Sequence, residues 1–310
     1  MSPADSAPAE GWSSRSVGAD WQHRFFYLLI RLGGRSAAYG FLRLVVLYYV
    51  LCRPDQRRKG LHYLRRRFPA ARGLALLRHS YRHILSLGQI LIDRAVVGIL
   101  GPGELAVSFP AGEELRALLR QRRGVILMTA HVGAWQVAMA ALDTLEVPVN
   151  LLMRREDGDV DRLVFEHRGG PSPFRIIDPA GEFGGALEMI AALKRGELLS
   201  VMGDRLLGSD RNGLAVTFLG GNVVVPFSAY KLASATGAPI AVLLSRKTGP
   251  KSYALELARV IEVPPGLGRG GAGFKPYAAE LAEALEGYVA ENPYQFFNFF
   301  DLWAAAPPAP

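Results

Sequence analysis

Apolar residues recur at helical spacing over residues 21–100, and Pro54 and Pro69 interrupt that pattern. Beyond this segment, short apolar runs alternate with helical stretches. The two patterns predict an α-helical layer over residues 21–100 and an α/β domain over residues 101–310. Residues 1–20 are rich in Ser, Pro, Ala and Gly and have no apolar periodicity, which predicts a disordered leader.

The second segment contains seven candidate strands, with four candidate helices among them. Alternating strands and helices predict a mixed, mainly parallel sheet flanked by helices on both faces. Ligands collect at the carboxyl ends of strands in such sheets, where His131 and Asp204 both fall. The strands are expected at 124–130, 147–153, 173–178, 197–203, 214–220, 238–246 and 252–263. The helices are expected at 134–145, 184–196, 226–237 and 274–292.

The N-terminal layer contains an apolar, tyrosine-rich run from Ser36 to Cys52 that only Arg43 interrupts. Basic residues border this run on both sides. A spanning helix needs about 20 apolar residues, so the run is marginal for crossing a membrane. An interfacial helix held by anionic lipid fits better, and the late start of the run argues against a signal peptide. A buried core helix surrounded by solvated arginines is the alternative.

The formal charge of +8 is distributed unevenly along the chain. Residues 1–83 carry a net charge of +11, and the remaining residues carry −3. The positive excess is interleaved with the apolar run and not with stacking aromatics on a sheet, so we expect anionic membrane lipid as a partner and no nucleic acid. The single cysteine, Cys52, excludes an intramolecular disulfide and is consistent with a reducing compartment.

One of the six histidines stands at a position suited to chemistry. His131 ends a predicted strand and opens a predicted helix, so its ring is expected in a crevice, where it can act as a general base. Gln136, in the first turn of that helix, can accept the second ring N–H without adding charge. The remaining histidines lack the spacing of metal ligands, which predicts no metal site: they are His23, His62, His79, His83 and His167.

A second candidate cluster is the sequence GDRLLGSDRNG, residues 203–213, which follows a predicted strand. Its arginines suit phosphate, whereas an ordinary polar loop with surface ion pairs is the alternative. The charged members of the cluster are Asp204, Arg205, Asp210 and Arg211. The late segment FFNFFDLW, residues 296–303, is expected either to pin the chain end to the core or to line an acyl groove. Its Asn298 and Asp301 are candidates for the same site.

Several separated motifs resemble one family. The sequence HVGAWQ is similar to the H-x4-D/E motif of the lipid A biosynthesis acyltransferases, relatives of the lysophospholipid acyltransferase superfamily. The sequences VMGDR, FLGGNVVVPFSAYKLASATGAPI and NPYQFFNFFDLW resemble later blocks of the same family. The resemblance implies transfer of an acyl group from an acyl-carrier-protein or coenzyme A thioester to a lipid or glycolipid hydroxyl at the cytoplasmic face of the bacterial inner membrane.

By this resemblance His131 matches the catalytic histidine, whereas Gln136 stands where the motif has its carboxylate and Ala134 replaces the usual Asn. Three outcomes are open: Gln136 orients the ring without charge, a carboxylate comes from Asp204 or Asp210, or catalysis has been lost.

The sequence as a whole predicts an acyltransferase attached to the membrane by an interfacial segment or a single N-terminal helix. The expected catalytic residues are His131, Gln136 and Asp204. The expected substrate-binding residues are Trp135, Arg205, Asp210 and Arg211. No metal and no cofactor besides the acyl thioester are expected. The alternative is a catalytically silent homologue that binds lipid or carrier protein.

Overall fold

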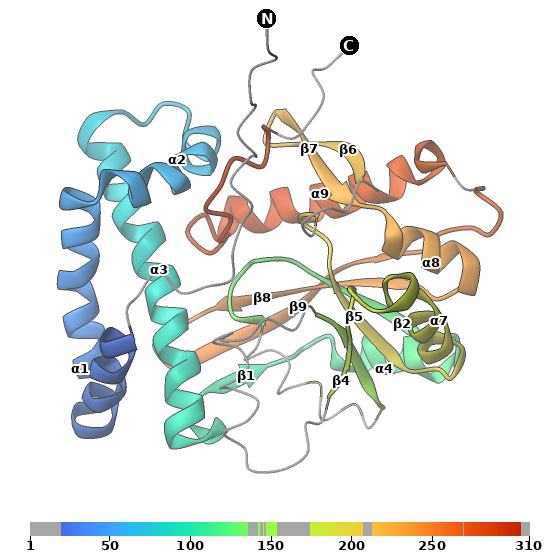
Figure 1. Cartoon of the computed structure of the whole chain (residues 1–310), viewed down its shortest axis with the longest axis horizontal. Coiled ribbons are helices and arrows are strands. Elements are labelled where there is room, and N and C mark those ends of the chain that lie inside the picture. The colour runs from blue at the N-terminus through green and yellow to red at the C-terminus, as the bar shows by residue number, and fades with distance from the viewer. Residues whose placement is uncertain are drawn as a thin grey trace, which may run out of the picture.

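A computed structural model describes residues 20–135, 142, 145, 147–153, 174–206, 213–268 and 270–304. A layer of three helices lies beside an α/β unit (Figure 1). The helices are α1 (Asp20–Cys52), α2 (Pro54–Arg67) and α3 (Gly73–Leu100). The prediction that Pro54 and Pro69 interrupt the helical pattern is confirmed, because α2 begins at Pro54 and ends two residues before Pro69.

Helix α1 bends at Gly34, which has a positive φ of 65°. Its buried apolar residues pack with α3 into a separate apolar cluster. After the bend they recur at every fourth position, as Ala38, Leu42, Val46 and Val50. The opposite face exposes large apolar side chains, and after the bend these are Phe41, Leu44, Leu47, Tyr48 and Leu51. Only 28% of the most apolar window in Arg24–Cys52 is buried. The alternative of a buried core helix therefore does not describe α1.

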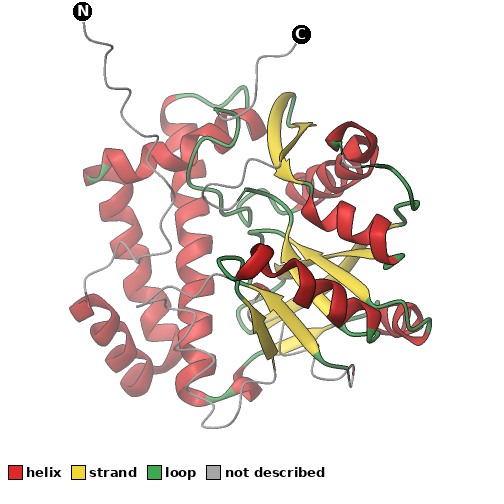
Figure 2. Cartoon of the chain, turned by 45° about the vertical axis from the view of Figure 1, so that its right-hand side comes forward, coloured by secondary structure: helices red, strands yellow, loops and turns green. Residues whose placement is uncertain are grey.

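The α/β unit is built on a mixed, mostly parallel sheet with flanking helices, as the sequence predicts (Figures 1 and 2). The strand order is β1-β9-β8-β2-β5-β3-β4, and β9 runs antiparallel to β8. Strand β2 is buried along its whole length between β5 and β8. The strands are β1 (Ala106–Ser108), β2 (Val125–Thr129), β3 (Val149–Leu152), β4 (Phe174–Ile177), β5 (Leu198–Met202), β8 (Ile240–Lys247) and β9 (Ser252–Ile261).

Helices of the α/β unit pack with the two faces of the sheet. The larger apolar cluster includes residues of α7, α8 and α9, and the smaller cluster on the other face includes residues of α4. The helices are α4 (Gly112–Arg120), α7 (Ala186–Lys194), α8 (Ser228–Thr236) and α9 (Lys275–Glu291). The short 3-10 helices are η1 (Pro102–Glu104), η3 (Glu182–Gly185) and η4 (Gly271–Phe274).

One expected strand lies outside the main sheet. Strand β6 (Gly213–Phe218) pairs antiparallel with β7 (Gly221–Pro226), and the two form a separate hairpin. The prediction that residues 214–220 join the main sheet is therefore wrong. Every second residue of β6 is buried, which fits a hairpin that covers the core with one face.

A buried charged cluster joins the helical layer to the sheet. Asp93 of α3 is fully buried and forms an ion pair with Arg35 of α1 at 3.1 Å. The same carboxylate pairs with Lys247 of β8 and accepts hydrogen bonds from Tyr39 and Tyr253. A carboxylate buried without partners is strongly unfavourable, so this cluster fixes α1 and α3 against β8 and β9.

Candidate active site

The register of two parallel strands brings the two central residues together. Thr129 of β2 pairs with Met202 of β5, and both strands end at these residues. His131 and Asp204 each follow two positions later, so both side chains lie at the carboxyl edge of the sheet. The backbone N–H of Gly203 donates to the carbonyl oxygen of Thr129 at 2.8 Å, which keeps the two chains together beyond the strand ends.

His131 and Asp204 form a hydrogen-bonded pair. The ring Nδ1 lies 2.9 Å from Oδ1 and 3.1 Å from Oδ2 of the carboxylate. The backbone N–H of His131 also donates to Asp204 Oδ2 at 3.2 Å. The Asp204 side chain is 1% exposed, whereas that of His131 is 21% exposed. The carboxylate is therefore enclosed, and part of the imidazole is open to solvent.

Asp204 remains ionised despite its burial. Burial favours the neutral acid, but the charge that His131 carries when protonated, its hydrogen bond, the charge of Arg205 and the hydrogen bond from Asn298 oppose it. The balance holds the pKa of Asp204 well below its usual range. This carboxylate can stabilise a proton on His131.

Arg205 contacts the other nitrogen of the ring. Its Nη2 lies against Nε2 of His131, and the guanidinium lies 5.6 Å from the centroid of the Phe300 ring. Because a guanidinium only donates hydrogen bonds, Nε2 must accept in this arrangement and Nδ1 carries the proton. Burial lowers the pKa of Arg205 to about 10, although the nearby Asp204 raises it. Arg205 is therefore a buried cation at neutral pH.

The C-terminal segment, residues 293–298, completes the surroundings of the pair. The backbone N–H of Phe297 donates to the carbonyl oxygen of His131 at 2.7 Å, and that of Gly133 donates to Gln295 at 2.9 Å. Asn298 is fully buried, and its Nδ2 donates to Asp204 Oδ2 at 2.8 Å. The sequence named Asn298 as a candidate without placing it. The sequence signal for Asn298 is its position between two phenylalanines. An amide buried among aromatic side chains requires hydrogen-bond partners.

Gly133 allows the segment after His131 to approach β8. Its φ is 52°, and a Cβ at this position would collide with the carbonyl oxygen of Ser245. The hydroxyl of Ser245 donates to the carbonyl oxygen of Val132 at 3.2 Å. The second residue after His131 is therefore restricted to glycine for both backbone and steric reasons.

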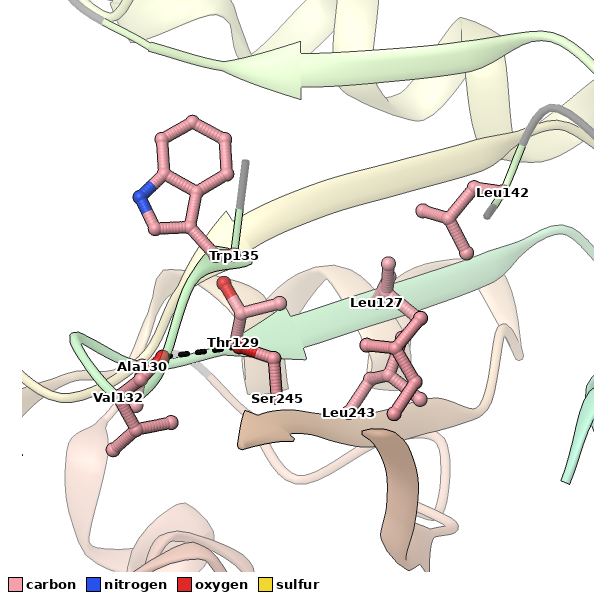
Figure 3. A pocket seen from close by; sticks show the side chains of 9 residues that line it. Leu127, Thr129, Ala130, Val132, Trp135, Leu142, Leu243 and Ser245 are labelled. Carbon is pink, nitrogen blue, oxygen red and sulfur yellow. Dashed lines mark hydrogen bonds between the residues drawn. The ribbon is translucent and has the colours of Figure 1, made fainter. Parts of the chain in front are cut away.

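Two apolar pockets flank the His131–Asp204 pair. The first is lined by Leu127, Thr129, Ala130, Val132, Trp135, Leu142, Leu243, Ser245 and Leu255 (Figure 3). The second lies between the β6–β7 hairpin and α9, and its lining is Asp204, Phe218, Val223, Val225, Leu281, Ala282, Leu285, Phe296 and Leu302. Of these two pockets, the second alone is lined by a charged side chain, the buried carboxylate of Asp204.

Several expected site residues are thus placed by the structure. His131, Asp204 and Arg205 are brought together, whereas Trp135 lines the first pocket. Asp301 pairs with His62 at 3.1 Å. Three other expected site residues, Gln136, Asp210 and Arg211, lie outside the described residues, and their roles stay predictions. Within the described ranges, no group of three or more His, Cys, Asp or Glu side chains is arranged to hold a metal ion.

Comparison with known proteins agrees with the motifs read from the sequence. A family model described as bacterial lipid A biosynthesis acyltransferase matches residues 16–305. No curated protein matches the chain. Since the family model spans the helical layer and nearly all of the α/β unit, the chain belongs to the bacterial lipid A biosynthesis acyltransferase family.

Proposed function

We propose that this protein transfers a fatty acyl chain from an acyl thioester to a hydroxyl or amine of a lipid or glycolipid, with His131 as the general base. The observation that carries the proposal is the 2.9 Å contact between His131 Nδ1 and Asp204 at the carboxyl edge of the sheet. A base of this kind needs a partner that fixes its tautomer and stabilises the imidazolium. Asp204 provides both.

The proposed reaction is addition followed by elimination at the thioester carbonyl. Nε2 of His131 takes the proton from the acceptor hydroxyl, and the oxygen forms a bond to the carbonyl carbon. The tetrahedral intermediate then breaks its C–S bond, and the imidazolium returns its proton to the leaving thiolate. The products are an ester, or an amide from an amine, and a free thiol. The side chains supply the base and the charges, so the proposal requires no metal or redox cofactor.

Arg205 has a defined part in this proposal. Its guanidinium contacts the same Nε2 that must accept the substrate proton, so the acceptor hydroxyl has to take its place. The displaced cation then lies beside the carbonyl, where negative charge develops on the oxygen. Positioned donors at such an oxyanion typically contribute a factor of about 10²–10³ to the rate.

The acyl chain is assigned to the first apolar pocket, which has room for about one water molecule and must widen to admit the chain. Its lining includes Ala130 and Val132, the residues on either side of His131, and its polar side chains are Thr129 and Ser245. The second pocket presents the buried Asp204 carboxylate, beside which an alkyl chain would exclude water from a charge. The proposal therefore assigns Trp135 to contact with the acyl chain.

The helical layer supports attachment to a membrane surface. Two helices, Arg24–Cys52 and Gly73–Leu100, are long and apolar enough to cross a membrane. However, the exposed Arg43 lies near the middle of the apolar run of α1, and Asp93 of α3 is paired with Lys247 of the sheet. Charges at these positions are costly in the hydrocarbon core. We therefore propose that α1 lies in the interface, with Leu44, Leu47 and Leu51 toward the lipid.

The inner membrane, its cytoplasmic face and the donor belong to the same proposal. An acyl-carrier-protein or coenzyme A thioester is the expected donor, and anionic lipid is the expected surface for the basic N-terminal region. The alternative is a catalytically silent homologue that binds lipid or carrier protein. The ionised Asp204 on His131 favours an active enzyme, since the pair retains a base and its carboxylate.

Acyl transfer into a bacterial lipid extract tests the proposal. Labelled acyl-carrier protein and labelled acyl-coenzyme A are supplied in parallel to wild type, His131→Ala and His62→Ala. His62 is a matched control, because it also contacts an aspartate, Asp301, but its side chain is 46% exposed. We expect a labelled lipid from wild type and His62→Ala and none from His131→Ala. If none of the three proteins forms a product while lipid binding is intact, the catalytically silent homologue becomes the supported alternative.

A further inference from the structure

Asn298 uses both ends of its amide on the charged groups of the site. Its Nδ2 donates to Asp204 Oδ2 at 2.8 Å, and its Oδ1 accepts from Arg205 Nη1 at 3.4 Å. The residue is 0% exposed. A short hydrogen bond to a buried carboxylate limits the movement of that carboxylate.

The contact to Asp204 supplies a constraint that His131 alone does not. His131 approaches the carboxylate through its ring and its backbone N–H, both from the chain that follows β2. Asn298 approaches from a different segment, 94 residues away in sequence, and makes the shortest of these three hydrogen bonds at 2.8 Å. Donors from two directions fix the plane of the carboxylate, and this plane determines how Asp204 meets Nδ1.

The backbone that carries Asn298 is itself held on both sides. Phe297 donates to the carbonyl oxygen of His131 at 2.7 Å. His83 of α3 contacts the carbonyl oxygen of Phe296 through Nε2 at 2.7 Å, and Tyr63 of α2 donates to Pro293 at 2.8 Å. These contacts tie residues 293–298 to the helical layer and to the segment after β2. Asn298 is thus presented to the site by a well-supported backbone.

We infer that Asn298 is a positioning residue for the proposed acyl transfer, which holds the Asp204 carboxylate against His131. This inference rests on the proposed function for its effect on rate. Its effect on the ring of His131 does not require turnover. Asn298 touches neither the acceptor nor the thioester and acts through Asp204.

The variants separate positioning from a general structural role. Asn298→Asp keeps the shape of the side chain but replaces the donor that faces Asp204, and Asn298→Ala removes both polar atoms. Asn292→Ala is the matched control, because Asn292 caps the end of α9 and its amide contacts the carbonyl oxygen of Tyr288 at 3.4 Å. Each substitution is also made in an Asp204→Asn background, and the thermal midpoint of every variant is measured.

We expect both Asn298 variants to lower kcat by about 10- to 100-fold, which is the usual effect of losing one hydrogen bond to a charged group. KM should stay within about 2-fold, since uniform substrate binding is not removed. In the Asp204→Asn background the same substitutions should add little, because Asn298 acts through that carboxylate. Asn292→Ala should match wild type. A loss of kcat that persists in full without Asp204 would overturn the inference.

The second readout is the tautomer of His131, measured by ¹⁵N chemical shifts of the ring at neutral pH and assigned by comparison with His131→Ala. Wild type should carry the proton on Nδ1, and the Asn298 variants should show a mixture of both tautomers. Unchanged shifts together with unchanged kcat would overturn the inference. If wild type transfers no acyl group, the proposed function fails, yet the tautomer still decides whether Asn298 positions the pair.

Discussion

The carboxylate of Asp204 lies 2.9 Å from Nδ1 of His131, although 73 residues separate the two in sequence. This nitrogen is the one for which the sequence proposed Gln136 as the partner. Since Asp204 contacts it, the proposed base has a charged partner, as the second of the three outcomes left open by the sequence requires.

The first prediction compares these two partners of the ring. Asp204→Asn should lower kcat by about 10³- to 10⁴-fold, because an amide neither stabilises the imidazolium nor enforces the Nδ1–H tautomer. Gln136→Ala should change kcat by less than about 3-fold, because Asp204 already contacts Nδ1. Steady-state kinetics with the acyl donor identified above measure both. A larger loss for Gln136→Ala than for Asp204→Asn would restore Gln136 as the orienting residue.

The second prediction concerns the cation on Nε2. Arg205→Gln should lower kcat by about 10²- to 10³-fold, because the cation that stabilises the oxyanion is lost. Arg259→Gln is the control, since this partly exposed arginine pairs with Glu280 and Glu283 of α9 at 3.4 Å. Faster transfer in Arg205→Gln than in wild type would mean that the guanidinium only blocks the base and makes no contribution to the transition state.

The third prediction tests the face of α1 that should meet lipid. Leu44→Glu and Leu51→Glu should each weaken binding to anionic vesicles by at least about 10-fold, since each replaces an exposed leucine that lipid would bury on binding. Leu187→Glu on α7 is the control, because this leucine is 63% exposed and lies outside the helical layer. Vesicle sedimentation measures the three variants. An equal loss of vesicle binding in all three variants would show that binding does not depend on this face of α1.

The fourth prediction is a pH dependence of stability that arises from His83. This ring is fully buried, and burial lowers its pKa from 6.5 to about 4, although the hydrogen bond to Phe296 raises it. Below pH 6.5 the unfolded chain binds a proton that the folded chain does not, so stability falls from about pH 6.5 to about pH 4 and levels off below. The size of this loss is about 3 kcal/mol at most.

Denaturant unfolding of wild type and His83→Gln at pH 7 and pH 4.5 measures this effect. Glutamine can still donate to the carbonyl oxygen of Phe296 but does not titrate, so the variant should lose less stability on acidification. His62→Gln should behave like wild type, because the His62 side chain is 46% exposed. An identical loss in all three proteins would assign the acid sensitivity to other groups.

Six of the seven strands of the main sheet could be predicted, because buried parallel strands are continuous apolar runs, as in β2 and β5. The short edge strand β1 was missed. Strand β7 and its pairing with β6 were missed, because an apolar run does not reveal its partner. Helix α4 was also missed, and it has the charged surface of a short amphipathic helix. Strands were therefore predicted correctly where full burial makes the sequence a continuous apolar run.

The residues of the candidate site also fall into those that the sequence could identify and those that it could not. His131 and Arg205 were recognisable from their neighbours in sequence, because each follows an apolar strand. The choice between Gln136 and Asp204 was not, because spacing along a helix is local, whereas the pairing of Thr129 with Met202 is a property of the sheet. Asn298 depends on a contact across 94 residues. No local pattern encodes such a distance.

Because the residues of the site are far apart in sequence, they emerge from the ribosome at different times. Translation produces α1 and α3 first, then His131, then Asp204, and Asn298 only 94 residues after Asp204. Because domains form from the N-terminus during synthesis, the helical layer emerges before His131 has its full set of partners. A nascent chain would thus present α1 and α3 well before the His131–Asp204 pair acquires its hydrogen bond from Asn298.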